Sequence, residues 1–199
     1  MPVTRNLYNA VYQYNTKIMA DTQLLTTALP TTYDEFLRFE PTDGAKYEWN
    51  DGELIKFAGM KRRHLRIIQN MNLRFDTTQA KQERGQLICE QDVMLTGIQM
   101  RRPDVAYFSD EQIRNEDDEP IPAFCVEVIS PTDESEKVES KRIEYFKAGV
   151  QVVWHIFPEN REVYVYTSRK TVQICSDDDI CSAHPVLDDF TISVNELLA

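Results

Sequence analysis

The sequence has no long hydrophobic run, and none of its apolar stretches approaches the roughly 20 residues that a helix needs to cross a bilayer. The N-terminus also lacks the basic stretch followed by an apolar core that marks a secretory signal. Both absences argue against a membrane protein and against a secreted one. We therefore expect the protein to be cytoplasmic.

Cysteine is scarce and carries no recognisable motif. The four cysteines, Cys89, Cys125, Cys175 and Cys181, form no CxxC pair. No histidine lies at zinc-ligand spacing from any of them, so the usual zinc-binding patterns are excluded. Cys89 and Cys125 lie inside apolar runs, where a cysteine usually packs as a small hydrophobic residue. We expect reduced thiols that are mostly packed in the interior.

Internal repeats, low-complexity tracts, and helicase-like or methyltransferase-like segments are also missing. The 199 residues are 42% hydrophobic and 28% charged, as in ordinary globular proteins. This length fits a single domain. Residues 1–30 show no firm periodicity, so we expect an N-terminal extension that is mobile or packs on a partner subunit, followed by one domain over residues 31–199.

The chain does not have the positive net charge of an indiscriminate nucleic-acid binder. Its formal net charge is -11, whereas phosphate contacts require basic surface. The charge is unevenly distributed, however, because Lys56–Pro103 contains ten Lys and Arg against four acidic residues. This basic segment could guide a polyanion, or it could be a solvated helix face.

Three local patterns organise the first half of the domain. Thr32 precedes two acidic residues and predicts a capped short helix. Residues 46–57 predict two strands joined at Asn50-Asp51-Gly52, because Asp-Gly readily adopts the positive φ angles of a tight hairpin turn. Farther on, apolar residues spaced three to four apart predict a helix that runs to about Gln82 and carries basic residues on its other face.

Strands dominate the second half. The acidic stretch 109–122 predicts a loop, and residues 133–148 predict a helix that Gly149 ends. The expected strands are 87–95, 103–108, 123–129, 152–157, 162–167 and 171–175. This alternation predicts an α/β domain with a central mixed sheet flanked by helices and an N-terminal β-hairpin.

Glu127 is the most informative residue, because it interrupts the apolar strand 123–129. An ionised carboxylate buried there without a partner would cost several kcal/mol. Glu127 therefore needs a cation, which is either a metal ion shared with Asp104 on a neighbouring strand or a basic side chain. Strand alternation places Glu127 on the same face as Cys125 and Ile129.

Lys141 is the second anomaly. In the predicted helix it lies on one stripe with Val138 and Tyr145, which places a lysine on the inward face. A lysine there could instead extend past the edge of the core. Together, Asp104, Glu127 and an inward Lys141 suit phosphodiester hydrolysis. Two carboxylates can hold Mg²⁺, and an ammonium can orient the attacking water and stabilise the developing charge.

Several motifs occur in a set order along the chain. They are Tyr47-Glu48-Trp49-Asn50-Asp51-Gly52-Glu53-Leu54, His64 at the start of a helix, Arg102-Pro103-Asp104-Val105-Ala106, Glu127-Val128-Ile129-Ser130-Pro131, and Lys141 with Tyr145, Gly149-Val150 and Trp154.

As a set, these motifs resemble the Uma family of putative restriction endonucleases over about residues 31–199. That family has the PD-(D/E)XK nuclease core. The resemblance therefore implies a restriction-endonuclease-like core, a Mg²⁺ or Mn²⁺ ion, and cleavage of DNA, commonly by a homodimer.

The resemblance also assigns roles. Asp104 matches the first acid of the core and Glu127 the second, so both are expected as metal ligands and catalytic residues. The usual core has a lysine two residues after the second acid, where this chain has Ile129. Lys141 would therefore have to reach back from the next helix. Glu53 matches another family acid and is a candidate third catalytic residue, although a Glu after Asp-Gly is often plain surface.

His64 also matches the family pattern, and three arginines follow or precede it in the basic helix. His64 could contact phosphate or assist proton transfer, or it could simply cap or pack. The expected nucleic-acid contacts are His64, Arg62, Arg63 and Arg66.

Three functions remain open from the sequence. The first is a Mg²⁺-dependent endonuclease acting on DNA. The second is an inactive protein with a nuclease fold that binds DNA or a protein partner. The third is a cytosolic enzyme for a small phosphorylated substrate, for which no salt-sensitive DNA binding is expected.

Overall fold

The computed structural model describes residues 29–57, 62–96, 99–115 and 119–199. The chain divides into two compact units, residues 1–45 and 46–199. The N-terminal extension expected over residues 1–30 lies almost wholly outside the described residues. None of the described helices is long and apolar enough to cross a membrane.

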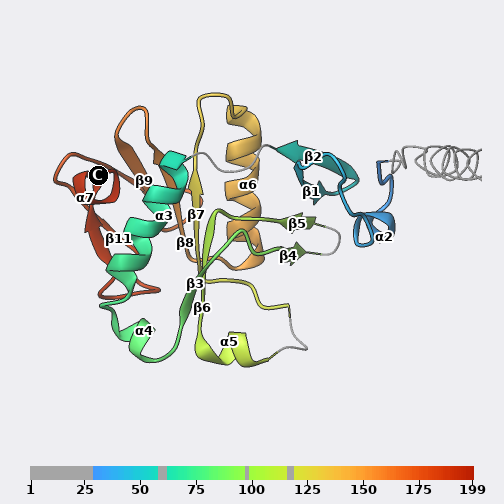
Figure 1. Ribbon diagram of the computed structural model, residues 1–199. Coiled ribbons are helices and arrows are strands. Elements are labelled where there is room, and N and C mark those ends of the chain that lie inside the picture. Colours follow the sequence, from blue (N-terminus) through green and yellow to red (C-terminus); the bar gives the residue numbers. More distant parts are fainter. Residues whose placement is uncertain (1–28, 58–61, 97–98, 116–118) are drawn as a thin grey trace, which may run out of the picture. The chain divides into compact units, whose positions relative to one another are not determined.

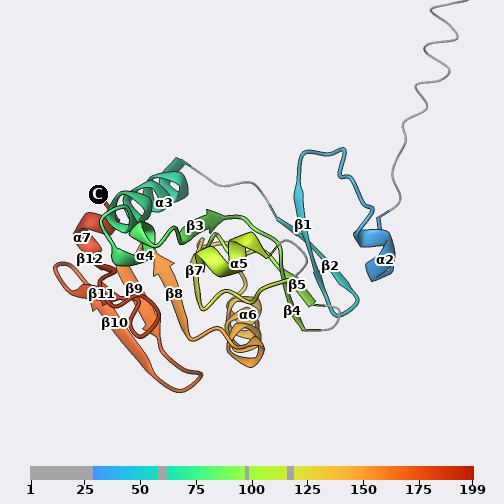
Figure 2. The same cartoon turned by 90° about the horizontal axis from the view of Figure 1, so that it is seen from below.

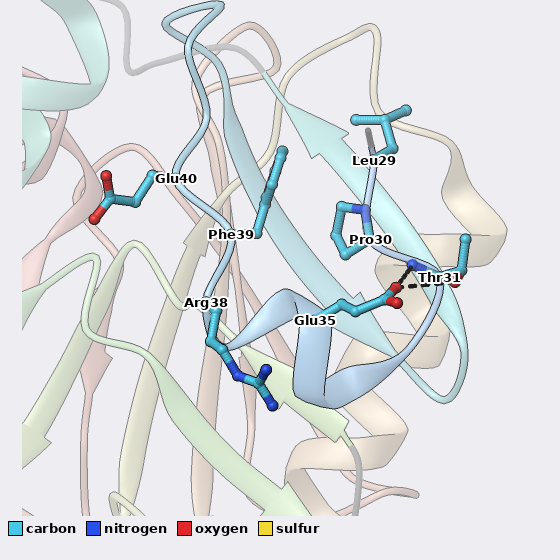
Figure 3. Close-up of a pocket in the computed structure, with 7 residues that line it drawn as sticks. All are labelled: Leu29, Pro30, Thr31, Glu35, Arg38, Phe39 and Glu40. Carbon is cyan, nitrogen blue, oxygen red and sulfur yellow. Dashed lines mark hydrogen bonds between the residues drawn. The ribbon is translucent and has the colours of Figure 1, made fainter. Parts of the chain in front are cut away.

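In the first unit, the helix α2, Tyr33–Phe36, begins at the predicted N-cap Thr32. The Glu35 amide donates to the Thr32 hydroxyl, and the Glu35 carboxylate accepts from the amides of Thr31 and Thr32. These hydrogen bonds, the Thr31 amide foremost, lower the pKa of Glu35. Figure 3 shows Glu35 and Arg38 lining a small pocket of this unit. The Glu35 carboxylate is thus already used as a cap, which leaves no ligand-binding role evident for it.

A six-stranded sheet forms the centre of the second unit, in the order β10-β9-β8-β7-β6-β3. Its strands β7 and β8 are parallel, whereas the other neighbouring pairs are antiparallel. The predicted mixed sheet is therefore confirmed. The six strands are β3 (Gln86–Cys89), β6 (Val105–Phe108), β7 (Phe124–Val128), β8 (Val152–Phe157), β9 (Glu162–Tyr166) and β10 (Val172–Ser176).

A smaller four-stranded sheet contains the predicted hairpin, in the order β2-β1-β5-β4. Asp51 and Gly52 connect β1 and β2 with φ angles of 47° and 94°, as the Asp-Gly turn requires. The strands β11 and β12 form a separate ribbon. The bounds are β1 (Lys46–Asn50), β2 (Glu53–Phe57), β4 (Val93–Thr96), β5 (Gln99–Arg101), β11 (Ile180–Ser182) and β12 (Thr191–Ser193).

Two long helices cover opposite faces of the six-stranded sheet (Figures 1 and 2). The helix α3, Arg62–Phe75, packs Met71 and Phe75 into the core that contains the even-numbered β7 residue Val126. The helix α6, Ser135–Ala148, packs Tyr145 into the core that contains the odd-numbered β7 residue Cys125. The sheet alternation predicted for Glu127 therefore places it on the α6 face.

Two predicted elements are divided in the structure. The helix expected to reach Gln82 ends at Phe75, and Thr78 caps a separate short helix α4, Gln79–Gln82. A threonine side chain that bonds backbone amides competes with helix continuation. The strand expected over residues 87–95 divides into β3 and β4, which belong to different sheets. The chain turns between them at Glu90, which has a φ of 52°.

Two further short helices were not predicted. The helix α5, Asp110–Arg114, lies in the expected loop 109–122 and begins at Ser109, whose side chain forms a capping box with Gln112. The helix α7, Val194–Leu197, begins with a similar cap at Ser193. The capping residues can be recognised in the sequence. A helix of four or five residues, however, is too short to show the periodic apolar face from which helices are predicted.

Gly85 provides a test of the packing where α4 meets the sheet. A Cβ at this position would lie 2.8 Å from Cε2 of Tyr107 and 2.9 Å from the Ala80 carbonyl oxygen. Because the second contact is with backbone, Gly85→Ala is expected to lower the free energy of unfolding by about 1–3 kcal/mol. Denaturant unfolding measures this loss. Exposed Gln86 provides the control, since Gln86→Ala should change stability by less than about 0.5 kcal/mol. Equal stability of both variants would contradict the close packing at Gly85.

Candidate functional site

The Glu127 carboxylate lies on β7 between two donors from α6. The Tyr145 hydroxyl donates to Glu127 Oε1 at 2.6 Å, and Lys141 Nζ lies 3.1 Å from Glu127 Oε2. Only 12% of the Glu127 side chain is exposed. Of the two partners left open by the sequence, a basic side chain is therefore present beside Glu127, and it is a lysine.

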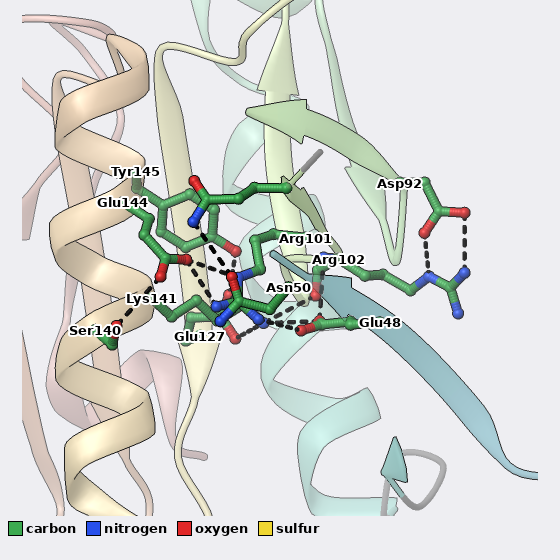
Figure 4. Close-up of polar contacts among 11 residues, drawn as sticks. Glu48, Asn50, Asp92, Arg101, Arg102, Glu127, Ser140, Lys141, Glu144 and Tyr145 are labelled. Carbon is green, nitrogen blue, oxygen red and sulfur yellow. Dashed lines mark hydrogen bonds and ion pairs between the residues drawn. The ribbon is translucent and has the colours of Figure 1, made fainter. Parts of the chain in front are cut away.

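Lys141 reaches this position from the first half of α6, as Figure 4 shows. Its ammonium also donates to Glu48 Oε1 at 3.0 Å and to the Arg102 carbonyl at 3.2 Å. Burial alone would lower the pKa of Lys141, but the carboxylates of Glu127, Glu48 and Asp104 outweigh it and raise the pKa above its ordinary value. Lys141 thus remains charged and holds elements together that are distant in sequence.

Asp104 comes next to Glu127 through the sheet register. Val105 on β6 pairs with Val126 on β7, which places the preceding residue, Asp104, opposite Glu127. Asp104 Oδ2 accepts a 2.6 Å hydrogen bond from the Val128 amide. Burial raises the pKa of Asp104, while the Val128 amide, Lys141 and His64 oppose the shift. The two acids predicted as metal ligands are therefore brought together at adjacent positions of two strands.

The site carries more negative charge than its lysine offsets. Burial raises the pKa of Glu127 to about 8; Asp104 and Glu48 add to the rise, whereas Lys141 and Tyr145 oppose it. On the neighbouring strand, His155 pairs with Glu127 in register. Burial, with the charge of Arg142 beside it, lowers the pKa of His155 to about 4. A neutral His155 brings no compensating charge, so the carboxylates favour an added cation.

The residues present fit a small divalent cation. Carboxylate oxygens are the ligands that Mg²⁺ prefers, and the ion commonly uses only one or two protein carboxylates, with water and substrate oxygens completing its coordination. Among the residues that the structure describes, no group of three His, Cys, Asp or Glu side chains could hold a metal ion. Asp104 and Glu127 are the two carboxylates that would hold a magnesium ion here, with water and substrate oxygens as its other ligands.

Glu48 is a member of the site that sequence reasoning missed. Its side chain, on β1, is 8% exposed and accepts from Lys141 and from the Arg102 amide at 3.1 Å. The sequence contained a usable signal, because Glu48 interrupts the pair of aromatic residues Tyr47 and Trp49 in a strand. The same anomaly drew attention to Glu127.

Arg101 forms a second buried ion-pair group next to Lys141. Its guanidinium donates to Glu144 Oε2 at 2.8 Å and lies 3.5 Å from Glu48 Oε2, with only 3% of the side chain exposed. Ser140 donates to the other oxygen of Glu144 at 3.2 Å. Glu48 thus lies between two cations, and Arg101 connects β5 to α6 beside the site. No sequence pattern indicated this contact.

The remaining predicted site residues lie outside this cluster or at its margin. Glu53 is exposed at the start of β2, and within the described residues no hydrogen bond joins it to Glu127, Asp104 or Lys141. His64 is half-buried near the start of α3, and its charge lowers the pKa of Asp104, so it lies at the margin of the site.

The three arginines near His64 differ in their contacts. Arg62 and Arg66 are exposed on α3. Arg63 pairs with Glu159 at 2.8 Å and donates to the Pro158 carbonyl, so part of its hydrogen-bonding capacity is already used within the protein.

The mixed sheet with a helix on each face has the restriction-endonuclease-like fold of nucleases. A crystal structure of a putative nuclease belonging to DUF820 from Anabaena variabilis matches this fold with a TM-score of 0.73. The two sequences are 22% identical, and the match covers 85% of this chain and 98% of that one.

The chain belongs to the Uma2 family, whose description is putative restriction endonuclease and whose model matches residues 33–195. This finding confirms the resemblance seen in the sequence motifs. No curated protein matches the chain.

The raised pKa of Glu127 predicts a pH-dependent stability. Glu127 binds a proton more tightly in the folded state, so its contribution is fully present below about pH 4.5 and is lost as the pH rises through about 8. Glu127→Gln has no such titration. Without metal, its stability relative to the native protein should rise by roughly 2 kcal/mol or more between pH 5 and pH 9, because one pKa unit corresponds to about 1.4 kcal/mol.

Thermal unfolding of both proteins in EDTA across this pH range measures the difference. Glu136→Gln, the same change at an exposed position of the helix α6, provides the control. A stability difference between Glu127→Gln and the native protein that stays constant with pH would contradict the raised pKa.

Proposed function

We propose that the protein is a Mg²⁺-dependent endonuclease that hydrolyses phosphodiester bonds of DNA in the cytoplasm. The observation that supports this most directly is the position of Asp104 opposite Glu127, next to the Val105–Val126 pair of β6 and β7, with the Lys141 ammonium 3.1 Å from Glu127. Two acids and one lysine suit metal-assisted phosphodiester hydrolysis, because the acids can hold the metal ion and the ammonium can stabilise developing negative charge.

Asp104 and Glu127 would hold the ion, with Mg²⁺ preferred and Mn²⁺ as a substitute. When bound, the ion supplies charge neutralisation for the phosphodiester and activation of the attacking water. The Val128 amide donates to Asp104 Oδ2 and so fixes the orientation of this carboxylate beside β7. Tyr145 likewise orients Glu127 through its hydroxyl. Both acids are thus held in place by donors from rigid elements, as a metal site requires.

Lys141 would orient the attacking water and stabilise negative charge on the phosphate. Lys141 stays protonated, because the surrounding carboxylates raise its pKa despite burial. Glu48 is a positioning residue in this proposal, since it holds the ammonium from the side opposite the strand β7. Of the three acceptors around Lys141, the Arg102 carbonyl is the one without a formal charge, so it is the contact most easily exchanged for water.

His64 and the exposed Arg62 and Arg66 would contact the DNA backbone. His64 lies near enough to Asp104 to lower its pKa, and the two arginines extend from the same end of α3. Positive charge at this margin would offset the net charge of -11 where phosphate approaches. Binding through these residues should weaken as the salt concentration rises.

A second candidate function is DNA or protein binding without cleavage. It is favoured by the contacts of Lys141, because Glu127, Glu48 and the Arg102 carbonyl can accept from all three of its N–H groups. A lysine held in this way serves as a structural bridge between strands and helix. Only release of one contact would leave it free for a water or a phosphate.

Cleavage assays on supercoiled plasmid DNA separate the two functions. With Mg²⁺, the native protein should nick the plasmid, whereas Asp104→Asn and Glu127→Gln should each lower the rate by at least about 100-fold, because each removes a charged metal ligand. Glu136→Gln provides the matched control and should retain activity. Nicking that persists in Asp104→Asn and Glu127→Gln would rule out this active site, and binding without nicking by the native protein would favour the second function.

Metal binding should also release a proton, because Glu127 has a pKa of about 8 and is mostly protonated at pH 7 without metal. Titration calorimetry with Mg²⁺ or Mn²⁺, in two buffers of different ionisation enthalpy, should show close to one proton released per ion. Glu127→Gln should bind the ion more weakly and release almost none. Binding by the native protein with no buffer dependence would show that the ion displaces no proton from Glu127.

A further inference from the structure

The Glu48 carboxylate lies among hydrogen-bond donors from β5 and α6, as Figure 4 shows. One of its oxygens, Oε1, accepts from the Lys141 ammonium at 3.0 Å and from the Arg102 amide at 3.1 Å. The other oxygen, Oε2, lies 3.5 Å from the Arg101 guanidinium. Three donors therefore converge on one anion, and two of them meet at the same oxygen atom.

The two donors at Glu48 Oε1 are of the kind that bind phosphate. Proteins commonly contact phosphate oxygens with lysine ammonium groups and with backbone amides. A phosphodiester resembles a carboxylate, because both carry one negative charge at neutral pH and both offer oxygens that only accept hydrogen bonds. The position of Glu48 Oε1 is accordingly one that a phosphate oxygen can take.

Contacts that do not involve Glu48 hold the Arg102 donor in place. Pro103 follows Arg102 and restricts its backbone to an extended conformation. The Arg102 carbonyl accepts from Lys141, and the Arg102 guanidinium donates to the two oxygens of Asp92 at 2.6 and 2.9 Å. The Arg102 amide therefore keeps its direction when its acceptor changes, so a new anion can bind with little rearrangement.

An exchange of Glu48 for a phosphate preserves the charge balance of the site. Lys141 keeps an anionic partner, which avoids the cost of several kcal/mol for an unpaired buried charge. Glu48 keeps the contact of its Oε2 with Arg101, whose side chain is only 3% exposed. Only the Oε1 atom of Glu48 loses its partners in such an exchange.

The donors are also more accessible than the carboxylate that they hold. The side chains of Lys141 and Arg102 are 17% and 20% exposed, whereas that of Glu48 is 8% exposed. A phosphate group can thus approach the two donors from solvent while Glu48 turns toward Arg101.

We propose that Glu48 is an internal competitor of the substrate, whose phosphate group displaces Glu48 Oε1 from the Lys141 ammonium and the Arg102 amide. This inference rests on the proposed function for the identity of the substrate, but the phosphate site itself does not depend on cleavage. Glu48 holds Lys141 in the free protein, and the phosphate takes over that contact in the complex. Because Glu48 is tethered beside the donors, it competes at an effective concentration on the order of millimolar or above and lowers the affinity for DNA.

DNA binding without metal tests the competition. In EDTA, fluorescence anisotropy of a short labelled duplex gives the dissociation constant without cleavage. Glu48→Gln keeps the size of the side chain and removes its charge, so it should lower the dissociation constant at least about tenfold, because charged hydrogen bonds are about twice as strong as neutral ones. Glu144→Gln is the matched control. It removes another buried carboxylate, which contacts Arg101 and Ser140 instead, and should change the dissociation constant much less.

Inorganic phosphate tests the site independently of DNA. Glu48→Ala removes the carboxylate, so phosphate should bind the two freed donors and raise the Tm of this variant by at least about 2 °C more than that of the native protein. Thermal unfolding in EDTA measures the shift, with sodium chloride at equal ionic strength as the salt control. The double variant Glu48→Ala/Lys141→Met lacks one donor and should lose this stabilisation.

Equal gains in DNA affinity for Glu48→Gln and Glu144→Gln would overturn the proposal, because they would show a general effect of lower negative charge. DNA binding by the native protein that is unchanged or weakened in Glu48→Gln would also overturn it, since Glu48 would then be a fixed ion-pair partner. Phosphate stabilisation that is absent, or that persists in the double variant, would exclude the site.

One further outcome separates this inference from the proposed function. Phosphate stabilisation of Glu48→Ala that is lost in the double variant, without DNA binding by any of the proteins, would support the phosphate site and contradict DNA as the substrate.

Discussion

The Lys141 ammonium, buried among Glu127, Glu48 and the Arg102 carbonyl, is the contact on which the site depends. It joins α6, the sheet strand β7 and the hairpin strand β1, which are separated by as many as 93 residues. Removing one partner from such a buried network leaves another charge unpaired, which costs several kcal/mol. The arrangement of the candidate site and the connection between the two sheets therefore rest on the same set of ion pairs.

The excess of negative charge gives this arrangement its chemical character. Burial raises the pKa of Glu127 and that of Asp104, because a low-dielectric surrounding disfavours their charged forms. Lys141 reduces this effect without cancelling it. The protonation of one buried carboxylate, Glu127, is thereby connected to the stability of the fold.

Much of the fold could be predicted from local pattern. The Asp51-Gly52 turn, the capped helix at Thr32, the apolar face of α3 and the stop at Gly149 each depend on the conformational preference of one or two residues. Elements that depend on distant partners were not predicted. The division of residues 87–95 between two sheets is one such case, since nothing within the segment distinguishes one long strand from two short ones.

For the site, the sequence by itself determined that Glu127 and Lys141 were anomalous, because a charged residue in an apolar strand or on an inward helix face is costly without a partner. Only the tertiary structure decided which residues are the hydrogen-bond and ion-pair partners of Glu127 and Lys141. The β6–β7 register placed Asp104 opposite Glu127, and the hairpin brought Glu48, rather than Glu53, to the lysine. The physical reason is that the penalty for burying a charge is local, whereas the contacts that offset it depend on how separate elements pack.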